Sequence, residues 1–262
     1  MIKSLVFLIG AIFFQIQGFA QTNLYEKQYF VNGEDTLPLR ILTPKNFSFQ
    51  KKYPLVIVLH GAGERGSDNE KQLVWGSTLF LDSVNRTNYP AIVVFPQCPE
   101  NMWWSPLKRG VDQKDSLGNF RVQSSQPITK PLQQVLNFID TLIAAGRVDP
   151  KRVYVGGLSM GGMGTFDLIT RRPNLVAAAF PICGAGDPTM INKCRKTLPL
   201  WIFHGADDTV VPVAQSRLMV NLLKEQIPPV KYSEYPGVGH DSWKNAFAEP
   251  GLLPWLFAQR KK

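Results

Sequence analysis

A serine placed between two glycines is the first sign of chemistry in this sequence. The segment GLSMG occupies residues 157–161, directly after a short apolar run and before a stretch whose apolar residues recur at helical spacing. A GxSxG sequence in that context is typical of a strained turn from a strand to a helix, which exposes the serine hydroxyl at the edge of a sheet. We therefore predict that Ser159 is a nucleophile.

A serine nucleophile requires a base within hydrogen-bond distance and a carboxylate that orients this base. The sequence contains three histidines. His60 and His204 each end an apolar run and precede a glycine, positions in which a histidine commonly satisfies local backbone groups. His240 lies in a glycine-containing turn, GVGHD, where its imidazole could reach an exposed serine. We predict His240 as the base and interpret His60 as a support for its own loop.

The carboxylate should also lie at the end of a strand, so that it reaches the same edge of the sheet as the serine. Asp207 and Asp208 follow an apolar run through the sequence His-Gly-Ala. The chain order Ser159, Asp208, His240 is the order of nucleophile, acid and base that such a serine turn predicts. We predict Asp208 as the acid, with Asp207 and Asp241 as alternatives.

The transition state of acyl transfer carries a negative oxygen, which backbone N–H groups must stabilise. The amide of Met160 follows the nucleophile and begins a predicted helix, whose dipole also favours negative charge. A second amide should come from the loop HGAG at residues 60–63, where glycines allow a close approach. We predict an oxyanion hole formed by Met160 and Ala62, with Gly63 as the alternative to Ala62.

The elements that must position these residues alternate along the chain. The sequence NGED at residues 32–35 indicates a hairpin between the first two strands. The alternation predicts one domain, residues 21–262, of the α/β class, with a mostly parallel, doubly wound sheet and helices on both faces. Short strand-like stretches cover residues 27–31 and 36–42, and the last predicted strand covers 232–235. Apolar runs that suit buried parallel strands cover residues 55–59, 91–95, 153–155, 176–182 and 200–203, and helical spacing occurs in 132–142, 163–169 and 213–223.

Residues 97–130 do not fit into a minimal sheet of this kind. They contain several prolines and polar residues without periodicity, so we predict a long loop that packs beside the substrate. Trp103 and Trp104 in this loop, together with Trp243, are candidates for stacking against an aromatic acyl group or a sugar. Packing in the core is an equally good interpretation for each tryptophan taken singly.

The first twenty residues have the composition of an export signal. Lys3 precedes an apolar stretch from Leu5 to Phe14, and Gly18 and Ala20 supply small residues before a cleavage point. The apolar stretch is shorter than the ~20 residues that a membrane-spanning helix needs. We predict cleavage after residue 20, a secreted or periplasmic protein, and no stable membrane span in the mature chain.

The chain is basic, with a formal net charge of +9. Its lysines and arginines are scattered singly or in pairs and form no stripe interleaved with aromatic residues. This distribution indicates a solvated surface and argues against a nucleic-acid partner.

All three cysteines lie in the predicted mature chain, at Cys98, Cys183 and Cys194. None has the CxxC spacing of a metal site. Cys183 and Cys194 close a short loop between two predicted strands, so in an oxidising compartment they are the favoured pair for a disulfide, with its geometry left open.

Several segments together resemble the phospholipase/carboxylesterase and dienelactone-hydrolase-like esterases of the α/β-hydrolase superfamily: LHGAGERGSDN, PQCP with a following Trp, GLSMGG, PICGAGD, HGADDTVVP and GVGHDSW. The resemblance covers most of the mature chain and implies an α/β-hydrolase fold. It assigns the acid to the aspartate four residues after the histidine of an HGxxD motif, which is Asp208. Only residues 183–199 occupy the place where many such proteins carry a helical cap, so we expect no large cap domain and an open site.

Exported members similar to this sequence include feruloyl and acetyl esterases that act on plant cell-wall polysaccharides. We therefore predict a secreted serine carboxylesterase that forms an acyl-enzyme and uses neither a metal nor an organic cofactor, with a small-molecule or polysaccharide-linked ester as substrate. One alternative is a prolyl-oligopeptidase-like peptidase, although the chain has no room for its usual gating domain. Another is a non-catalytic carbohydrate-binding protein, which the complete triad argues against. The oligomeric state does not follow from the sequence.

Overall fold

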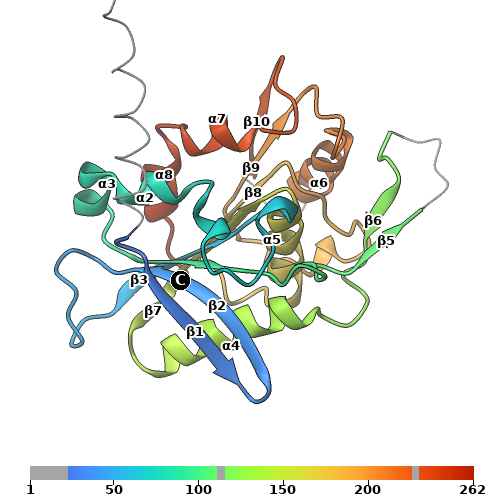
Figure 1. The fold of residues 1–262 in the computed structure, drawn as a ribbon. Coiled ribbons are helices and arrows are strands. Elements are labelled where there is room, and N and C mark those ends of the chain that lie inside the picture. Colours follow the sequence, from blue (N-terminus) through green and yellow to red (C-terminus); the bar gives the residue numbers. More distant parts are fainter. Residues whose placement is uncertain (1–22, 111–115, 226–229) are drawn as a thin grey trace, which may run out of the picture.

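The computed structural model describes residues 23–110, 116–225 and 230–262, and Figure 1 shows their arrangement. The predicted export signal, residues 1–20, lies outside these ranges. Within these ranges, all but two of the strands belong to one large sheet.

The large sheet has eight strands in the order β1-β2-β4-β3-β7-β8-β9-β10 (Figure 1). The pairs β1–β2 and β2–β4 are antiparallel, and all later neighbours run parallel. This arrangement is the α/β-hydrolase fold, as the sequence predicted. The strands are β1 (Glu26–Asn32), β2 (Asp35–Leu42), β3 (Tyr53–Leu59), β4 (Ile92–Pro96), β7 (Val148–Leu158), β8 (Ala178–Ile182), β9 (Leu200–Gly205) and β10 (Val230–Tyr235).

The central strands are apolar on both sides because each side of the sheet has its own core. In β3, Leu55, Ile57 and Leu59 belong to one buried cluster, whereas Val56 and Val58 belong to another. Successive side chains of a strand point to opposite faces, so this continuous apolar run fills both cores.

Helices cover both faces of the sheet. The first core receives α4 (Lys130–Ala144), α5 (Met160–Arg171) and α6 (Ala214–Lys224), which correspond to the three segments with helical spacing. Four helices of about two turns or less lie on the side of the second core, and they are too short to show helical spacing in the sequence. They are α2 (Ser77–Leu81), α3 (Ser83–Asn88), α7 (Trp243–Phe247) and α8 (Leu252–Phe257). Of these, α3 has no buried residue, and only Tyr89 directly after it packs against the core.

The predicted long loop at residues 97–130 contains a second, two-stranded sheet. Strands β5 (Leu107–Arg109) and β6 (Phe120–Val122) pair in antiparallel and extend to one side of the molecule (Figure 1). The prediction of an irregular loop was wrong here, since strands of three residues are too short to show an alternating pattern. Between β8 and β9 the chain forms only the short 3-10 helix η3 (Ile191–Lys193), so no large cap covers the site.

The expected disulfide between Cys183 and Cys194 is absent. Both cysteines are free and buried, and so is Cys98. Cys183 packs in the core beside α7 and α8, whereas Cys194 packs in the core on the opposite face of the sheet. The sheet therefore separates the two thiols, which closeness in sequence could not show.

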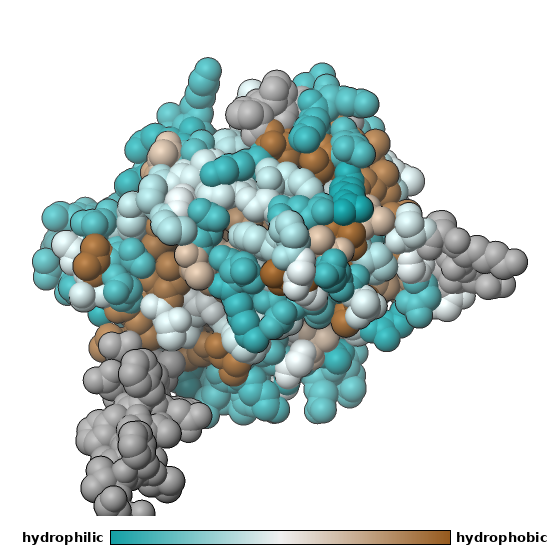
Figure 2. Space-filling view, turned by 90° about the horizontal axis from the view of Figure 1, so that it is seen from above, coloured by the Kyte–Doolittle hydropathy of each residue, from teal (hydrophilic) through white to brown (hydrophobic). Residues whose placement is uncertain are grey.

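The surface carries no continuous apolar face in the view of Figure 2, where apolar residues form separate patches between hydrophilic ones. Within the described ranges, no helix combines the length and the apolar character that crossing a bilayer requires.

Candidate active site

The turn between β7 and α5 holds Ser159 in a strained conformation. Ser159 has φ 53° and ψ −114°, a region that a residue with a side chain seldom adopts. The turn closes tightly on β3: a Cβ atom at Gly157 would lie 2.5 Å from the carbonyl oxygen of Leu59 and 2.6 Å from that of Gly161. A glycine is therefore required at position 157 for the turn to approach the neighbouring strand.

The structure brings the three predicted triad residues together. Nε2 of His240 lies 2.9 Å from Oγ of Ser159, and Nδ1 of His240 lies 2.7 Å from Oδ2 of Asp208. Parallel strands end at the same edge of a sheet, so β7, β9 and β10 deliver their following residues to one place. With Nδ1–H donating to the carboxylate, Nε2 is free to accept the serine proton.

Asp208 is held as a carboxylate by a set of donors. Its Oδ1 accepts hydrogen bonds from the backbone N–H groups of Val210 and Val211, at 2.8 and 2.9 Å. Burial alone would raise the pKa of Asp208. The hydrogen bonds from His204, His240 and the Val211 amide outweigh burial and keep this pKa well below its usual range.

His204 is a member of the site that the sequence interpretation missed. It is fully buried, and its Nε2 lies 3.1 Å from Oδ2 of Asp208 and 2.9 Å from the carbonyl oxygen of Val211. Its Nδ1 lies 2.7 Å from Oγ of Ser216, which fixes the ring from the other side. The carboxylate oxygen that orients His240 is thus also fixed by a second histidine. Its position four residues before the acid was the available signal.

The two alternative acids lie elsewhere. Asp207 is exposed, and its backbone N–H donates to the carbonyl oxygen of Val238. Asp241 is exposed and forms an ion pair with Lys244 at 2.7 Å. Neither carboxylate has a hydrogen bond to His240 among the described residues.

The loop after β3 lies close to the nucleophile. A Cβ atom at Gly61 would lie 3.7 Å from Cβ of Ser159, and Ala62 begins the 3-10 helix η1 (Ala62–Glu64). Ala62, Ser159 and Met160 line one cleft. The backbone N–H groups of Ala62 and Met160 have no acceptor in the part of the chain that the structure describes, which leaves both donors available to a bound oxygen.

The buried side chains of His60 and Trp104 hold this loop by hydrogen bonds to its backbone. His60 is buried, its Nδ1 lies 2.6 Å from the carbonyl oxygen of Gly61, and its Nε2 accepts a hydrogen bond of 2.9 Å from the Cys98 amide. Trp104 is also fully buried, and its indole N–H donates to the carbonyl oxygen of His60 at 3.1 Å. The prediction that Trp104 contacts substrate was wrong, because this ring is part of the core beneath the loop.

Trp103, in contrast, faces the nucleophile. It lines the Ser159 cleft, which has a volume of about 290 Å³, together with Phe120 of the β5–β6 hairpin. The guanidinium groups of Arg65 and Arg109 lie 4.9 and 4.4 Å from the centre of a Trp103 ring. These cation–π contacts hold the indole in place beside the cleft.

Trp243 lies on the other side of the triad. Its ring packs edge to face against the ring of His240, with centres 5.3 Å apart, and also contacts Trp75 at 5.7 Å. The three predicted tryptophans thus divide into one beside the cleft, one in the core and one behind the base.

A metal ion would compete with the triad. Among the described residues, one group of possible metal ligands combines Cys183, Asp208 and His240, with ligand atoms within 4.8 Å of one another. Asp208 and His240 already bond to each other, and burial raises the pKa of the Cys183 thiol far above its usual range. The donors are therefore arranged for proton transfer, and the thiol is not a ready ligand.

Comparison with known sequences agrees with this geometry. The family described as phospholipase/carboxylesterase matches residues 47–249. The chain belongs to this family. Members of the phospholipase/carboxylesterase family are α/β-hydrolases that use a serine nucleophile, so the chain is a serine hydrolase.

Three proteins that are similar to this chain carry different names. A solved structure described as a thermostable esterase has a TM-score of 0.80 and 35% identity, covering 92% of this chain and 64% of that one. A bifunctional acetylxylan esterase/xylanase of Neocallimastix patriciarum is 34% identical over 87 residues, which are 33% of this chain and 13% of that protein. An acyl-protein thioesterase 1 of Gibberella zeae is 26% identical over 209 residues, 71% of this chain and 83% of its relative.

Proposed function

We propose that the protein is an exported carboxylesterase whose catalytic triad is Ser159, His240 and Asp208. The observation that carries this proposal is the continuous hydrogen-bonded chain from the serine hydroxyl through the imidazole to the carboxylate, with distances of 2.9 and 2.7 Å. The predicted export signal supports export.

In the proposed reaction, Oγ of Ser159 attacks the ester carbonyl carbon while Nε2 of His240 takes its proton. The negative carbonyl oxygen of the tetrahedral intermediate accepts hydrogen bonds from the Ala62 and Met160 amides. His240 then gives the proton to the leaving alcohol oxygen, which leaves an acyl group on Ser159. A water molecule, deprotonated by His240, releases the acid by the same route. No step calls on a metal or an organic cofactor.

For the substrate we propose acetyl or feruloyl esters carried on plant polysaccharide. One support is the similarity to a protein named as an acetylxylan esterase/xylanase. Another is the absence of a large cap between β8 and β9, which leaves the nucleophile accessible to an ester on a polymer. The Trp103 ring beside the cleft suits an aromatic acyl group.

The test is hydrolysis of an ester panel by the mature protein and by Ser159→Ala. The panel contains short-chain nitrophenyl esters, methyl ferulate and acetylated xylan. We expect turnover of at least one ester and a loss of about a thousandfold or more in kcat for the variant, because the nucleophile is removed. Equal rates for both proteins would contradict the triad. If the protein hydrolyses nitrophenyl esters but neither methyl ferulate nor acetylated xylan, the esterase proposal stands and the polysaccharide substrate is rejected.

A further inference from the structure

A second, larger groove begins directly behind the base. It has a volume of about 830 Å³, within the range of roughly 300–1,000 Å³ usual for ligand sites, and lies between helices α2 and α3 on one side and α7 and α8 on the other. Trp243, which packs against the ring of His240, forms its near end beside Trp75. The groove shares no lining residue with the Ser159 cleft.

The chemistry of the triad determines which groups of the protein the alcohol part and the acyl part of the ester must approach. During acylation, Nε2 of His240 protonates the leaving oxygen, so the alcohol part of the ester must lie within hydrogen-bond distance of this ring. The acyl group stays on Ser159, beside the cleft lined by Ala62 and Trp103. Trp243 contacts the ring of His240, so it is the groove residue that lies beside the base at which the alcohol part must sit.

The groove has the surface of a carbohydrate site. Trp75, Trp243 and Phe247 are half-buried and offer ring surface, and Phe247 packs so closely that a Cβ atom at Gly76 would lie 2.5 Å from its ring. Polar side chains lie along the rim, among them Asn88. Sugars combine apolar C–H faces with hydroxyl groups, so aromatic surface bordered by amides suits them.

The charged residues that line the groove are Asp82, Lys244 and Glu249, two acids and one base. Asp82 accepts hydrogen bonds from the first amides of α3, and Lys244 pairs with Asp241 and lies over the Trp75 ring. Glu249 is partly buried on the opposite wall. The lining therefore has a net charge of −1, which disfavours an anionic partner and does not oppose a neutral one.

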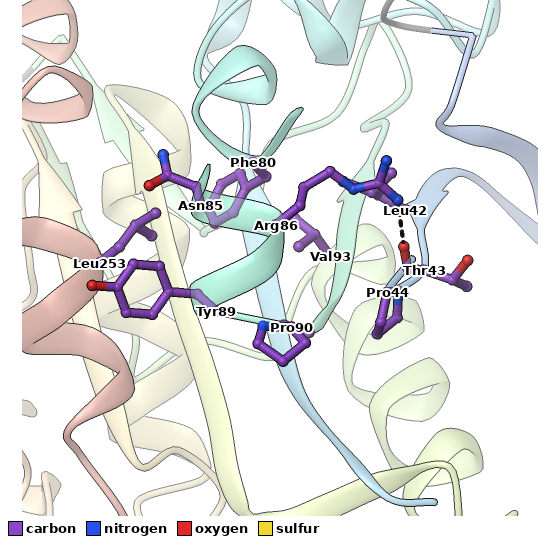
Figure 3. Close-up of a pocket in the computed structure, with 11 residues that line it drawn as sticks. Leu42, Thr43, Pro44, Phe80, Asn85, Arg86, Tyr89, Pro90, Val93 and Leu253 are labelled. Atoms are coloured by element: carbon purple, nitrogen blue, oxygen red, sulfur yellow. Dashed lines mark hydrogen bonds between the residues drawn. The ribbon is translucent and has the colours of Figure 1, made fainter. Parts of the chain in front are cut away.

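Figure 3 shows a small pocket that adjoins the groove. Asn85 of α3 and Tyr89, the residue directly after α3, project toward Leu253 of α8. Arg86 turns away and donates a hydrogen bond to the carbonyl oxygen of Thr43 at 3.0 Å. Asn85, Tyr89 and Leu253 belong both to this small pocket and to the groove. The row of aromatic and amide side chains thus continues away from the triad along α3.

We infer that the groove between α2–α3 and α7–α8 binds the neutral sugar chain that carries the ester, with Trp75 and Trp243 as the stacking platform nearest the base. The inference rests on the proposed function, because it identifies the alcohol part of that substrate. Val74 and Val84 are exposed at the rim, so a bound acyl chain is the competing occupant that the experiment must distinguish.

The first experiment measures binding without turnover. Xylohexaose is titrated into Ser159→Ala by calorimetry, and then into the same protein with Trp75→Ala or Trp75→Phe. Loss of the indole should weaken binding about tenfold, whereas phenylalanine should restore most of the affinity because it retains an aromatic face. Tyr29→Ala is the matched control, since Tyr29 is an exposed aromatic residue on β1, and should leave the affinity unchanged.

Two results of this titration would overturn the inference: no binding of xylohexaose to Ser159→Ala, or equal binding by the protein that also carries Trp75→Ala. The second experiment uses active protein and compares kcat/KM on acetylated xylan with kcat/KM on nitrophenyl acetate. Trp75→Ala should lower the ratio of the two at least fivefold. A selective loss on nitrophenyl decanoate instead would assign the groove to acyl chains and reject the inference. Wild-type hydrolysis of nitrophenyl acetate separately decides the esterase proposal.

Discussion

The three histidines of this chain occupy three different environments. His240 is partly exposed and bonds to a hydroxyl and a carboxylate. His204 is buried against Asp208 and a backbone carbonyl. His60 is buried where it must donate to one backbone group and accept from another, and burial lowers its pKa to about 4. A neutral His60 is therefore part of the folded state.

This requirement predicts a loss of stability in mild acid. The unfolded chain binds a proton at His60 below its ordinary pKa of about 6.5, whereas the folded chain resists until about pH 4. The contribution is thus complete above pH 6.5 and is lost as the pH falls from 6.5 to 4. Between pH 7 and pH 5 His60 should lower the free energy of unfolding by about 2 kcal/mol, measured by urea denaturation.

His60→Gln provides the control, because glutamine does not titrate. Its overall stability should be lower, since one or both backbone partners of His60 lose their hydrogen bonds. Its loss between pH 7 and pH 5 should nevertheless be about 2 kcal/mol smaller than that of the wild type. The same loss in both proteins would contradict a depressed pKa at His60.

Among single residues, the sequence predicted those whose motif and order along the chain are required by the reaction. Ser159, Asp208 and His240 follow from one motif and one chain order, and the structure brings them together. The sequence could not show which of Trp103 and Trp104 lies in the core and which lies beside the cleft, because the two tryptophans are adjacent and either could be turned inward by the loop. The contact of Trp104 with His60 depends on a neighbour 44 positions away.

At the scale of elements, the turn from β7 to α5 depends on close contact between backbones. We expect Gly157→Ala to destabilise the protein by about 3 kcal/mol and to lower kcat, since the new methyl group would meet two carbonyl oxygens. Thermal and urea unfolding measure the first effect, and nitrophenyl ester hydrolysis measures the second.

Gly63→Ala is the matched substitution in the opposing loop. A Cβ atom at Gly63 would meet nothing within 4 Å, and its φ is not in the left-handed region. Its stability should stay within about 0.5 kcal/mol of the wild type. If Gly157→Ala were equally tolerated, the close packing of the turn against β3 would not be a constraint on the sequence.

The long helices and central strands were predictable because they extend over enough residues for a period to repeat. The β5–β6 hairpin and the short helices of the second core were not, since their conformation depends on contacts with distant parts. Phe120 of β6 packs against a cluster that contains Met163 and Val211. Those contacts build one wall of the Ser159 cleft, so the least predictable elements are also the ones that line the cleft and the groove behind His240.

At the scale of the whole molecule, folding hides all three thiols. Burial raises the pKa of Cys98 and of Cys194 to about 12, and that of Cys183 further still. The native protein should not react with Ellman's reagent, and the protein unfolded in guanidinium should release three thiols per chain. One thiol per unfolded chain would instead indicate that two of the three cysteines form a disulfide, which would contradict the three free thiols.

The overall architecture followed from the sequence more fully than the cysteine chemistry did. Alternation of strand and helix determines a doubly wound sheet, because a parallel strand needs a crossover to return. Pairing of cysteines depends on which face of the sheet each one occupies. A shift of a single residue reverses that face, so loop length between Cys183 and Cys194 was a poor guide.

The Ser159 cleft and the groove behind His240 are separate surfaces with no lining residue in common. Under the proposed function and the sugar site inferred above, the two products of one turnover would have independent exits. The released acid would diffuse away past the β5–β6 hairpin while the sugar chain stayed bound between α3 and α8. Such an enzyme would move to the next ester on the same polymer before it dissociates, so its action on a decorated chain would be processive.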